Sequence, residues 1–428
     1  FFIQYIYEYI IDSLMVTNYL IFLTSYFLIV LSVIGHGVLA IKFTKTNVSL
    51  DEIGFVGLVG IFFLILYSYI THFFFKHGYL HNIIFIIIGL VSMYYFKSKI
   101  LIKKNLIFLF SVFSIIFVAF IIFKTHDDFG YYHFPYSYYL NKFSMIIGIG
   151  PLNHGFKTPS SIFYLNSLFY LPYLDYYLYH MGSILVLGFS NIVLISNIKK
   201  CLSKKDNNNF FFLNLLAFIF INVFFYRIAE HGTDRSAQIL VFLFFIYILS
   251  LRGHYERFDN ILPKLIILLS LIISFKSFYI LYFIFIIPFI YNILKDDKAY
   301  LINKIFRNRI LYFSILMGIC VMLVYFFNTG CLLYPVQQTC ISGIEWGIPK
   351  SQVSALNTHY QWWSKAGGGP GYSHEIEKEL YIQNFNWLSN WINKYFFNKM
   401  SDFLLSLLFI SIIFVIIFRS KKKKLINK

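Results

Sequence analysis

Long runs of apolar residues, separated by short polar stretches, dominate the hydropathy pattern of the chain. A helix that crosses a membrane needs about 20 mostly apolar residues, and about eleven runs approach that length. They cover residues 15–41, 53–71, 80–96, 105–123, 176–196, 210–226, 239–251, 261–275, 278–294, 310–327 and 403–418. The pattern predicts an all-α, polytopic integral membrane protein with about eleven transmembrane helices, in a single transmembrane domain over residues 1–428.

Two of the segments between these runs are too long to be simple turns. Residues 124–175 are rich in aromatic side chains and are interrupted by Gly148, Pro151 and Pro159. We expect them to form an amphipathic loop of one or two interfacial helices. Residues 328–401 form a second long segment, late in the chain.

Basic residues occupy alternate connections between the apolar runs. The basic stretches are 42–45, 97–104, 199–205, 252–264, 295–309 and 419–428. Because loops rich in Lys and Arg stay in the cytoplasm, these six stretches are predicted to be cytoplasmic. The segments 124–175 and 328–401 then both face the outer side of the membrane.

Composition agrees with a membrane protein. The chain is 59% hydrophobic and 13% charged, whereas soluble domains carry roughly 25% charge. The net charge of +17 therefore reflects topology, and no nucleic-acid partner is predicted. Abundant Phe, Ile, Tyr, Lys and Asn with little Ala is typical of an AT-rich genome and suggests a bacterium. We expect the protein in the bacterial inner membrane, with its active site facing the periplasm. The chain begins with Phe1 rather than Met, so we expect residues to precede it.

The four cysteines divide between the two predicted sides. Cys331 and Cys340 lie in the late outer segment, and their short spacing favours a disulfide in an oxidising compartment. Cys201 lies in a basic stretch and Cys320 within an apolar run. We expect these two to be free and to serve as small buried side chains.

Two adjacent carboxylates, Asp127 and Asp128, directly follow the run 105–123 and are flanked by His126 and His133. A carboxylate can act as a general base towards a hydroxyl group. A neighbouring carboxylate and burial both raise its pKa towards neutral pH. Asp is also a favoured helix N-cap, so a capping role for this pair stays open.

A second polar cluster, EHGTDRSAQ, covers residues 230–238 and contains His231, Asp234 and Arg235. A guanidinium group binds phosphate oxygens in a bidentate manner and keeps its charge. Arg235 is therefore a candidate for binding a lipid phosphate. Pairing with Asp234 or Glu230, or extension to the headgroup region, is the alternative. Three other cations are candidates for the same role: Lys157, Arg227 and Lys276.

Other catalytic signatures are missing from the sequence. No HExxH zinc motif and no GxSxG serine motif occurs. We predict no cofactor, although a divalent metal held by Asp127, Asp128 and a histidine stays open.

The layout resembles the GT-C superfamily of multi-span glycosyltransferases, which use polyprenyl-phosphate-linked sugars. HDDFGYYHFPY at 126–136 stands in the place of their acidic motif. Residues 124–175 look like their amphipathic outer loop, and residues 328–401 look like their late outer segment. The chain is also similar to uncharacterised bacterial membrane proteins with an outer-loop DD motif.

The resemblance implies a mechanism on the periplasmic face. Asp128 or Asp127 would take the proton of the acceptor hydroxyl as it attacks the anomeric carbon, with inversion. Arg235, with Lys157 or Lys276, would neutralise the leaving phosphate. The sugar pocket would be shaped by His126, His133 and the neighbouring tyrosines. The implied partners are the lipid-linked sugar, membrane lipids, and a glycan, lipid or protein acceptor.

Three other classes of function stay open. An envelope polysaccharide polymerase or ligase would depend on outer arginines such as Arg235 more than on the acidic pair. A transporter of lipid-linked glycans would carry ionisable residues near mid-membrane, where these apolar runs carry almost none. A structural or assembly subunit would have no chemistry.

Overall fold

The computed structural model describes residues 2–96, 103–121, 127–203, 209–224, 228–251, 258–287, 303–369 and 371–401, with residues 404, 405, 408 and 412. The described residues are nearly all helical, as predicted. The chain divides into two compact units. Unit 1 is Phe1–Leu332 and unit 2 is Leu333–Lys428.

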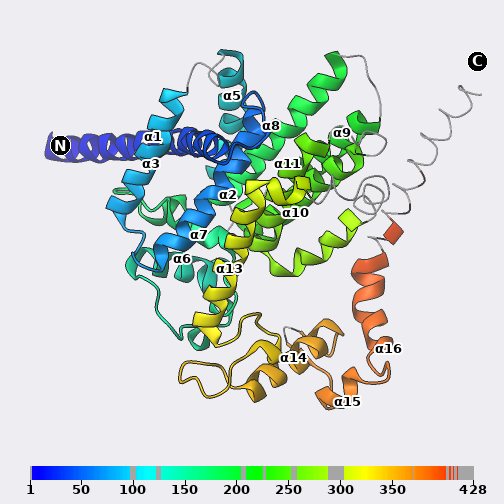
Figure 1. Ribbon diagram of the computed structural model, residues 1–428. Helices are drawn as coiled ribbons and strands as arrows, with labels where there is room; N and C mark the ends of the chain where they lie inside the picture. The colour runs from blue at the N-terminus through cyan, green and yellow to red at the C-terminus, as the bar shows by residue number, and fades with distance from the viewer. Residues whose placement is uncertain are drawn as a thin grey trace, which may run out of the picture. The chain divides into compact units, whose positions relative to one another are not determined.

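Unit 1 is a bundle of long helices with shorter helices at one end (Figure 1). The long helices are α1 (Phe2–Thr44), α2 (Ile53–His72), α3 (Tyr79–Tyr95), α5 (Lys103–Ile121), α8 (Met181–Ser203), α9 (Asn209–Phe224), α10 (Ile228–Ser250), α11 (Phe258–Phe275) and α13 (Arg309–Thr329). The shorter helices are η1 (Phe129–His133), α6 (Phe134–Lys142), η2 (Gly150–Leu152), η3 (His154–Phe156), α7 (Ser161–Ser167), η4 (Tyr176–Leu178) and η6 (Ser277–Ile286).

Seven helices among the described residues are long and apolar enough to cross a membrane. They are Asn18–Thr44, Ile53–His72, Lys104–Ile121, Tyr176–Ser203, Thr233–Ser250, Phe258–Phe275 and Arg309–Thr329. Tyr79–Tyr95 and Asn209–Val223 are shorter apolar helices. Each of them coincides with a predicted run. The predicted count of about eleven is not confirmed, because η6 occupies part of 278–294 and most of 403–418 lies outside the described residues.

The core of unit 1 lies around α2 and α8, which are the most buried of these spanning helices. Helix α1 packs on α2 and α3, while α10 packs on α8, α9 and α11. Glycines allow the closest approaches in this core. A Cβ atom on Gly35 would lie 1.8 Å from the carbonyl oxygen of Gly89, and one on Gly60 would lie 2.1 Å from that of Val33. Small residues permit such close backbone contact between membrane helices.

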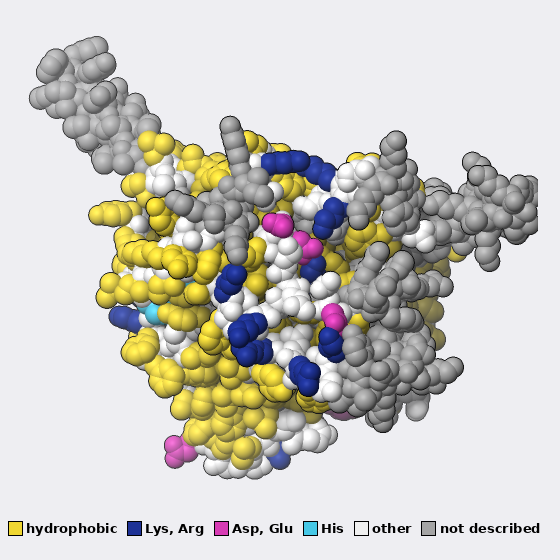
Figure 2. Space-filling view, turned by 45° about the horizontal axis from the view of Figure 1, so that its top comes forward, with side chains coloured by type: hydrophobic (Ala, Val, Ile, Leu, Met, Phe, Trp, Pro, Cys, Tyr) yellow, Lys and Arg dark blue, Asp and Glu magenta, His cyan; other side chains and the backbone are white. Residues whose placement is uncertain are grey.

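Ion pairs connect helices at one end of unit 1, which we call the basic end. Here α1 and α8 end and α2 and α11 begin. Lys264, only 7% exposed, forms an ion pair with Glu52 at the start of α2, and Lys200 of α8 lies 3.7 Å from the same carboxylate. Lys304 pairs with Asp259 at 2.5 Å. Figure 2 shows lysine and arginine side chains, with a few acidic ones, gathered on one face and flanked by hydrophobic side chains.

The opposite end of unit 1, which we call the motif end, contains residues 127–180. Helix α6 buries four of its nine residues, as an amphipathic helix does, but all seven residues of α7 are buried. The polar side chains of α7 are bonded to other segments: Ser161 Oγ donates to the carbonyl of Ser274, and Asn166 Oδ1 accepts from the N–H of Gly182, at 2.8 and 2.9 Å. The interfacial loop predicted for 124–175 is therefore, at α7, part of the core.

Unit 2 contains η7 (Gln337–Thr339), α14 (Lys350–Ser364), α15 (Lys378–Ile382), α16 (Leu388–Trp391) and η8 (Ile392–Met400). Strands β1 (Gly368–Gly369) and β2 (Tyr372–Ser373) form a short antiparallel pair. Tyr381 is fully buried and donates to the carbonyl of Lys365 at 2.8 Å, so α15 is bonded to the end of α14.

The cysteines have the states that their positions in the sequence predicted. Cys331 and Cys340 are disulfide-bonded. Cys201 and Cys320 are free and buried.

Candidate functional site

The two carboxylates of the acidic motif differ in their surroundings. Asp127 is exposed, whereas Asp128 is partly buried at the start of η1. The Asp128 side chain makes no capping hydrogen bond to the backbone. Its Oδ2 atom instead accepts a hydrogen bond of 3.2 Å from the hydroxyl of Tyr132, one turn further on. Asp128 is therefore the better placed of the two for chemistry.

Tyr132 connects the acidic motif with the second polar cluster. Burial raises the pKa of its hydroxyl, and the negative charges of Asp128 and Asp234 raise that pKa further. Both carboxylates therefore lie close enough to act on this one hydroxyl, although about a hundred residues separate them in the chain.

Asp234 of α10 forms an ion pair with Lys276, the residue before η6. Its Oδ1 atom lies 2.8 Å from Nζ of Lys276, and the two side chains are 49% and 45% exposed. Beside this pair, Arg235 Nη1 donates to Oε1 of Gln238 at 3.0 Å, and Gln238 Nε2 donates to the hydroxyl of Tyr279 at 3.1 Å. The start of α10 and the start of η6 thus hold a carboxylate, an ammonium and a guanidinium group close together.

The other described candidates lie around Tyr132. His133 is 7% exposed, and its ring centroid lies 4.4 Å from that of Tyr132 and 5.0 Å from that of Phe163. The ring of Tyr132 packs on Gly155, where a Cβ atom would lie 2.1 Å from Tyr132 Cγ. Lys157 follows two residues later, and burial lowers the pKa of its ammonium group. Bringing an anion to Lys157 would offset that burial.

The side chains of three candidate residues are not described. His126 and Arg227 lie outside the described residues, and His231 belongs to α10 without a described side chain. Within the described part of the chain, no group of three His, Cys, Asp or Glu side chains is arranged to hold a metal ion. The metal site considered for Asp127, Asp128 and a histidine therefore has no support from the described residues.

Sequence reasoning missed Gln238 and Tyr279, because it placed residues 227–238 in a loop. The structure instead begins α10 at Ile228, so the polar cluster occupies the first turns of a helix. Asp234 and Gln238 are four residues apart and share one helix face. If the helical periodicity of the run 239–251 is extended towards the N-terminus, Asp234 and Gln238 fall on one helix face.

An apolar cavity of about 300 Å³ lies between α10, α11, η6 and α13. Leu and Ile side chains make up most of its lining, and among the described lining residues only Ser270 and Ser314 are polar. On α10 its lining includes Ile248, in the last turn near the basic end, whereas on α11 it extends from Phe258 to Ile273, three residues before Lys276. Its lining matches the chemistry of a hydrocarbon chain.

These features define a nearly all-α protein with several helices apolar enough for multiple membrane crossings and a charged cluster at one end of its bundle. The chain belongs to the family described as Domain of unknown function (DUF8201), whose model matches residues 19–427. No curated protein and no solved structure matches the chain.

Proposed function

We propose that the protein is a membrane glycosyltransferase that moves a sugar from a polyprenyl-phosphate donor to an acceptor. The reaction takes place on the periplasmic face of a bacterial inner membrane. The observation that carries this proposal is the convergence of Asp128, Tyr132, Asp234 and Lys276, with Arg235 beside them, from three separate parts of the chain. A base and two cations in one place are what glycosyl transfer from a phosphate requires.

In this proposal each group of the cluster has a role. Asp128 accepts the proton of the acceptor hydroxyl, whose oxygen then forms a bond to the anomeric carbon. The bond between that carbon and the phosphate oxygen breaks on the opposite side, so the configuration inverts. Lys276 and Arg235 neutralise the charge that develops on the departing polyprenyl phosphate. Tyr132 positions the Asp128 carboxylate through its hydrogen bond.

The apolar cavity supports the lipid part of the proposal. Its described lining extends along α11 to Ile273, three residues before Lys276, and consists mostly of hydrocarbon side chains. A polyprenyl chain that follows α11 in this cavity as far as Ile273 would bring its phosphate towards Lys276. The six basic stretches support the orientation, since they favour a cytoplasmic basic end and a periplasmic motif end.

The test compares Asp128→Asn with Asp127→Asn, its exposed neighbour, as the matched control. Both variants and the wild type are expressed at equal levels, and lipid-linked sugars and surface glycans are profiled by mass spectrometry. We expect Asp128→Asn to lower transfer about 100-fold or more. It should accumulate the lipid-linked sugar and lose one glycan residue, while Asp127→Asn stays near wild type.

A third variant separates the transferase from the envelope polymerase or ligase. If Arg235→Ala abolishes glycan extension while Asp128→Asn leaves it intact, the polymerase or ligase is the better assignment. If folded Asp128→Asn, Asp127→Asn and wild-type protein give identical profiles, Asp128 has no catalytic role and the transferase proposal fails.

A further inference from the structure

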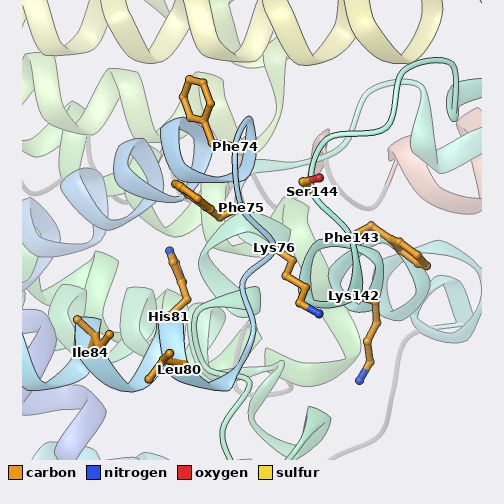
Figure 3. A pocket seen from close by; sticks show the side chains of 9 residues that line it. All are labelled: Phe74, Phe75, Lys76, Leu80, His81, Ile84, Lys142, Phe143 and Ser144. Atoms are coloured by element: carbon orange, nitrogen blue, oxygen red, sulfur yellow. The ribbon is translucent and has the colours of Figure 1, made fainter.

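A surface pocket that is not part of the charged cluster around Asp128 lies where the turn after α2 meets the end of α6. It is an open pocket of about 600 Å³ (Figure 3). Phe75, Leu80 and Ile84 supply apolar side chains that are at least half exposed. Lys76 and Lys142 supply two cations, and none of the nine lining residues is acidic. In Figure 3 the two lysine side chains point towards the same side of the pocket.

Lys142 is held in a fixed position. Its Nζ donates to the hydroxyl of Tyr170 at 2.8 Å and lies 4.8 and 5.0 Å from the ring centroids of Tyr138 and Tyr170. Tyr170 in turn stacks on Tyr79, whose hydroxyl donates to Asp175. An ammonium group fixed by aromatic rings keeps donors for an anion at little cost in side-chain entropy.

His81 also lines the pocket, but it is not part of the cationic pair. One of its ring nitrogens lies 3.2 Å from the hydroxyl of Tyr67 and the other 2.9 Å from Oδ1 of Asn82. Both nitrogens are therefore engaged within the protein. The positive charge of the pocket comes from Lys76 and Lys142.

An apolar stripe begins in the pocket and continues along the exposed face of α3. Its members follow helical spacing and are 43–73% exposed: Leu80, Ile84, Ile87, Ile88 and Val91. From Leu80 to Val91 the helix rises about 16 Å. That is close to half of the roughly 30 Å hydrocarbon core of a bilayer, which is the depth of one leaflet.

We propose that this pocket binds a phospholipid whose headgroup has a net negative charge. The phosphate lies between Lys76 and Lys142, and one acyl chain follows the stripe on α3. A soluble phosphate would use the two cations but would have no use for the apolar stripe, so we assign the site to a membrane lipid. The site is separate from the charged cluster around Asp128 and does not depend on the proposed transferase activity.

The experiment is native mass spectrometry of the full chain in detergent, titrated with phosphatidylglycerol or phosphatidylcholine. Wild type should retain phosphatidylglycerol about 25-fold more tightly than phosphatidylcholine, since each of the two lysines near an anionic headgroup contributes about fivefold. Lys76→Ala should weaken phosphatidylglycerol retention about fivefold. The exposed Lys350 of unit 2 provides the matched control, and Lys350→Ala should change nothing.

Further variants separate binding from folding. Lys142→Arg should keep the preference for phosphatidylglycerol, whereas Lys142→Ala should lower it. Ile84→Ser should weaken the retention of both lipids. Glycerol 1-phosphate at millimolar concentration should not displace the lipid; displacement would instead identify a soluble phosphate site. Equal retention of the two lipids by wild type, or unchanged retention in Lys76→Ala with Lys142→Ala, would overturn the proposal.

Discussion

The Asp234–Lys276 ion pair illustrates how little an exposed pair contributes to folding. Both side chains are nearly half exposed, and such pairs stabilise proteins by about 0–1 kcal/mol. The stability gain is too small to account for bringing these charges together beside Asp128 and Arg235. The proposed role of Lys276, neutralising the leaving phosphate, would account for these charges lying together.

This reasoning predicts that Lys276→Ala separates activity from stability. We expect the rate of sugar transfer to fall about 100-fold, because a phosphate loses a cation in its transition state. The free energy of unfolding should fall by no more than about 1 kcal/mol. Initial rates with a labelled donor in membranes, and melting temperatures in detergent, measure the two quantities.

Lys304 offers a matched control for this prediction. It is 40% exposed and pairs with Asp259 at 2.5 Å, but at the basic end. Lys304→Ala should therefore have a similarly small effect on melting and none on transfer. Equal rates for Lys276→Ala and Lys304→Ala would show that Lys276 does not act on the substrate.

Individual residues also mark the limit of what the sequence can predict. The sequence identified Asp127 and Asp128 together, since adjacency alone cannot show which of them is buried. It offered Asp234 or Glu230 as a partner for Arg235, but it did not foresee that Asp234 pairs with Lys276 or that Arg235 donates to Gln238. These choices depend on where η6 meets α10, which no local pattern encodes.

At the level of elements, apolar runs predicted the long helices well, because about 20 apolar residues are decisive by themselves. They failed at α7 and at the start of α10, where polar side chains are accommodated inside helices. In α7 the sequence SIFYLNS reads as half polar. Its serines and asparagine are nonetheless bonded within the core, through contacts between residues far apart in the chain.

His77 connects several of these elements. Its ring nitrogens lie 2.8 Å from Ser167 Oγ and 3.1 Å from Thr71 Oγ1, and its backbone N–H donates to the carbonyl of Leu140. The turn after α2 is thus bonded to both α6 and α7. Burial lowers the pKa of His77 well below its usual range, and the neighbouring His72 lowers it further.

A pH dependence of stability follows from this shift. The folded-state pKa of His77 is depressed, so its contribution is fully present above the unfolded pKa of about 6.5 and is lost as pH falls below it. We expect unit 1 to lose roughly 1 kcal/mol per pH unit from this residue. Melting temperatures at pH 7.5 and pH 5 measure the loss.

His77→Gln removes the titrating group and keeps a polar side chain, so its melting temperature should fall less between the two pH values. His154→Gln changes an exposed histidine of η3, and its melting temperature should fall as much as that of the wild type. An identical pH response of His77→Gln and wild type would show that His77 is protonated as readily in the folded chain as in the unfolded one.

On the scale of the whole molecule, charge is asymmetric between the two ends of unit 1. The basic end holds structural pairs such as Glu52–Lys264, in which a buried ammonium is neutralised by a carboxylate. The motif end holds the Asp234–Lys276 pair, which is partly exposed, as is the Lys304–Asp259 pair of the basic end. A buried cation such as Lys264 needs its partner, because an unpaired buried charge would destabilise the fold. Partly exposed charges stay accessible to a ligand. The transferase proposal depends on the accessible charges of the motif end.

Orientation can be tested with single cysteines, because the native ones give little background. Cys201 and Cys320 are buried, and Cys331 and Cys340 are disulfide-bonded. Asn47, Thr158 and Ser389 are exposed, in the turn after α1, the segment after η3, and unit 2. In intact spheroplasts an impermeant maleimide should label Thr158→Cys and Ser389→Cys strongly. Asn47→Cys should react only after permeabilisation.

The reverse pattern would place the motif end in the cytoplasm. Polyprenyl-phosphate sugars could still reach Asp128 from the inner leaflet, but the acceptor could no longer be a periplasmic glycan. The positive-inside argument would then have failed on six basic stretches at once. Labelling of Thr158→Cys without Ser389→Cys would separate the sides of the two units, and only unit 1 would then carry the periplasmic site. The labelling pattern therefore determines which acceptors the Asp128 cluster can serve before any sugar is identified.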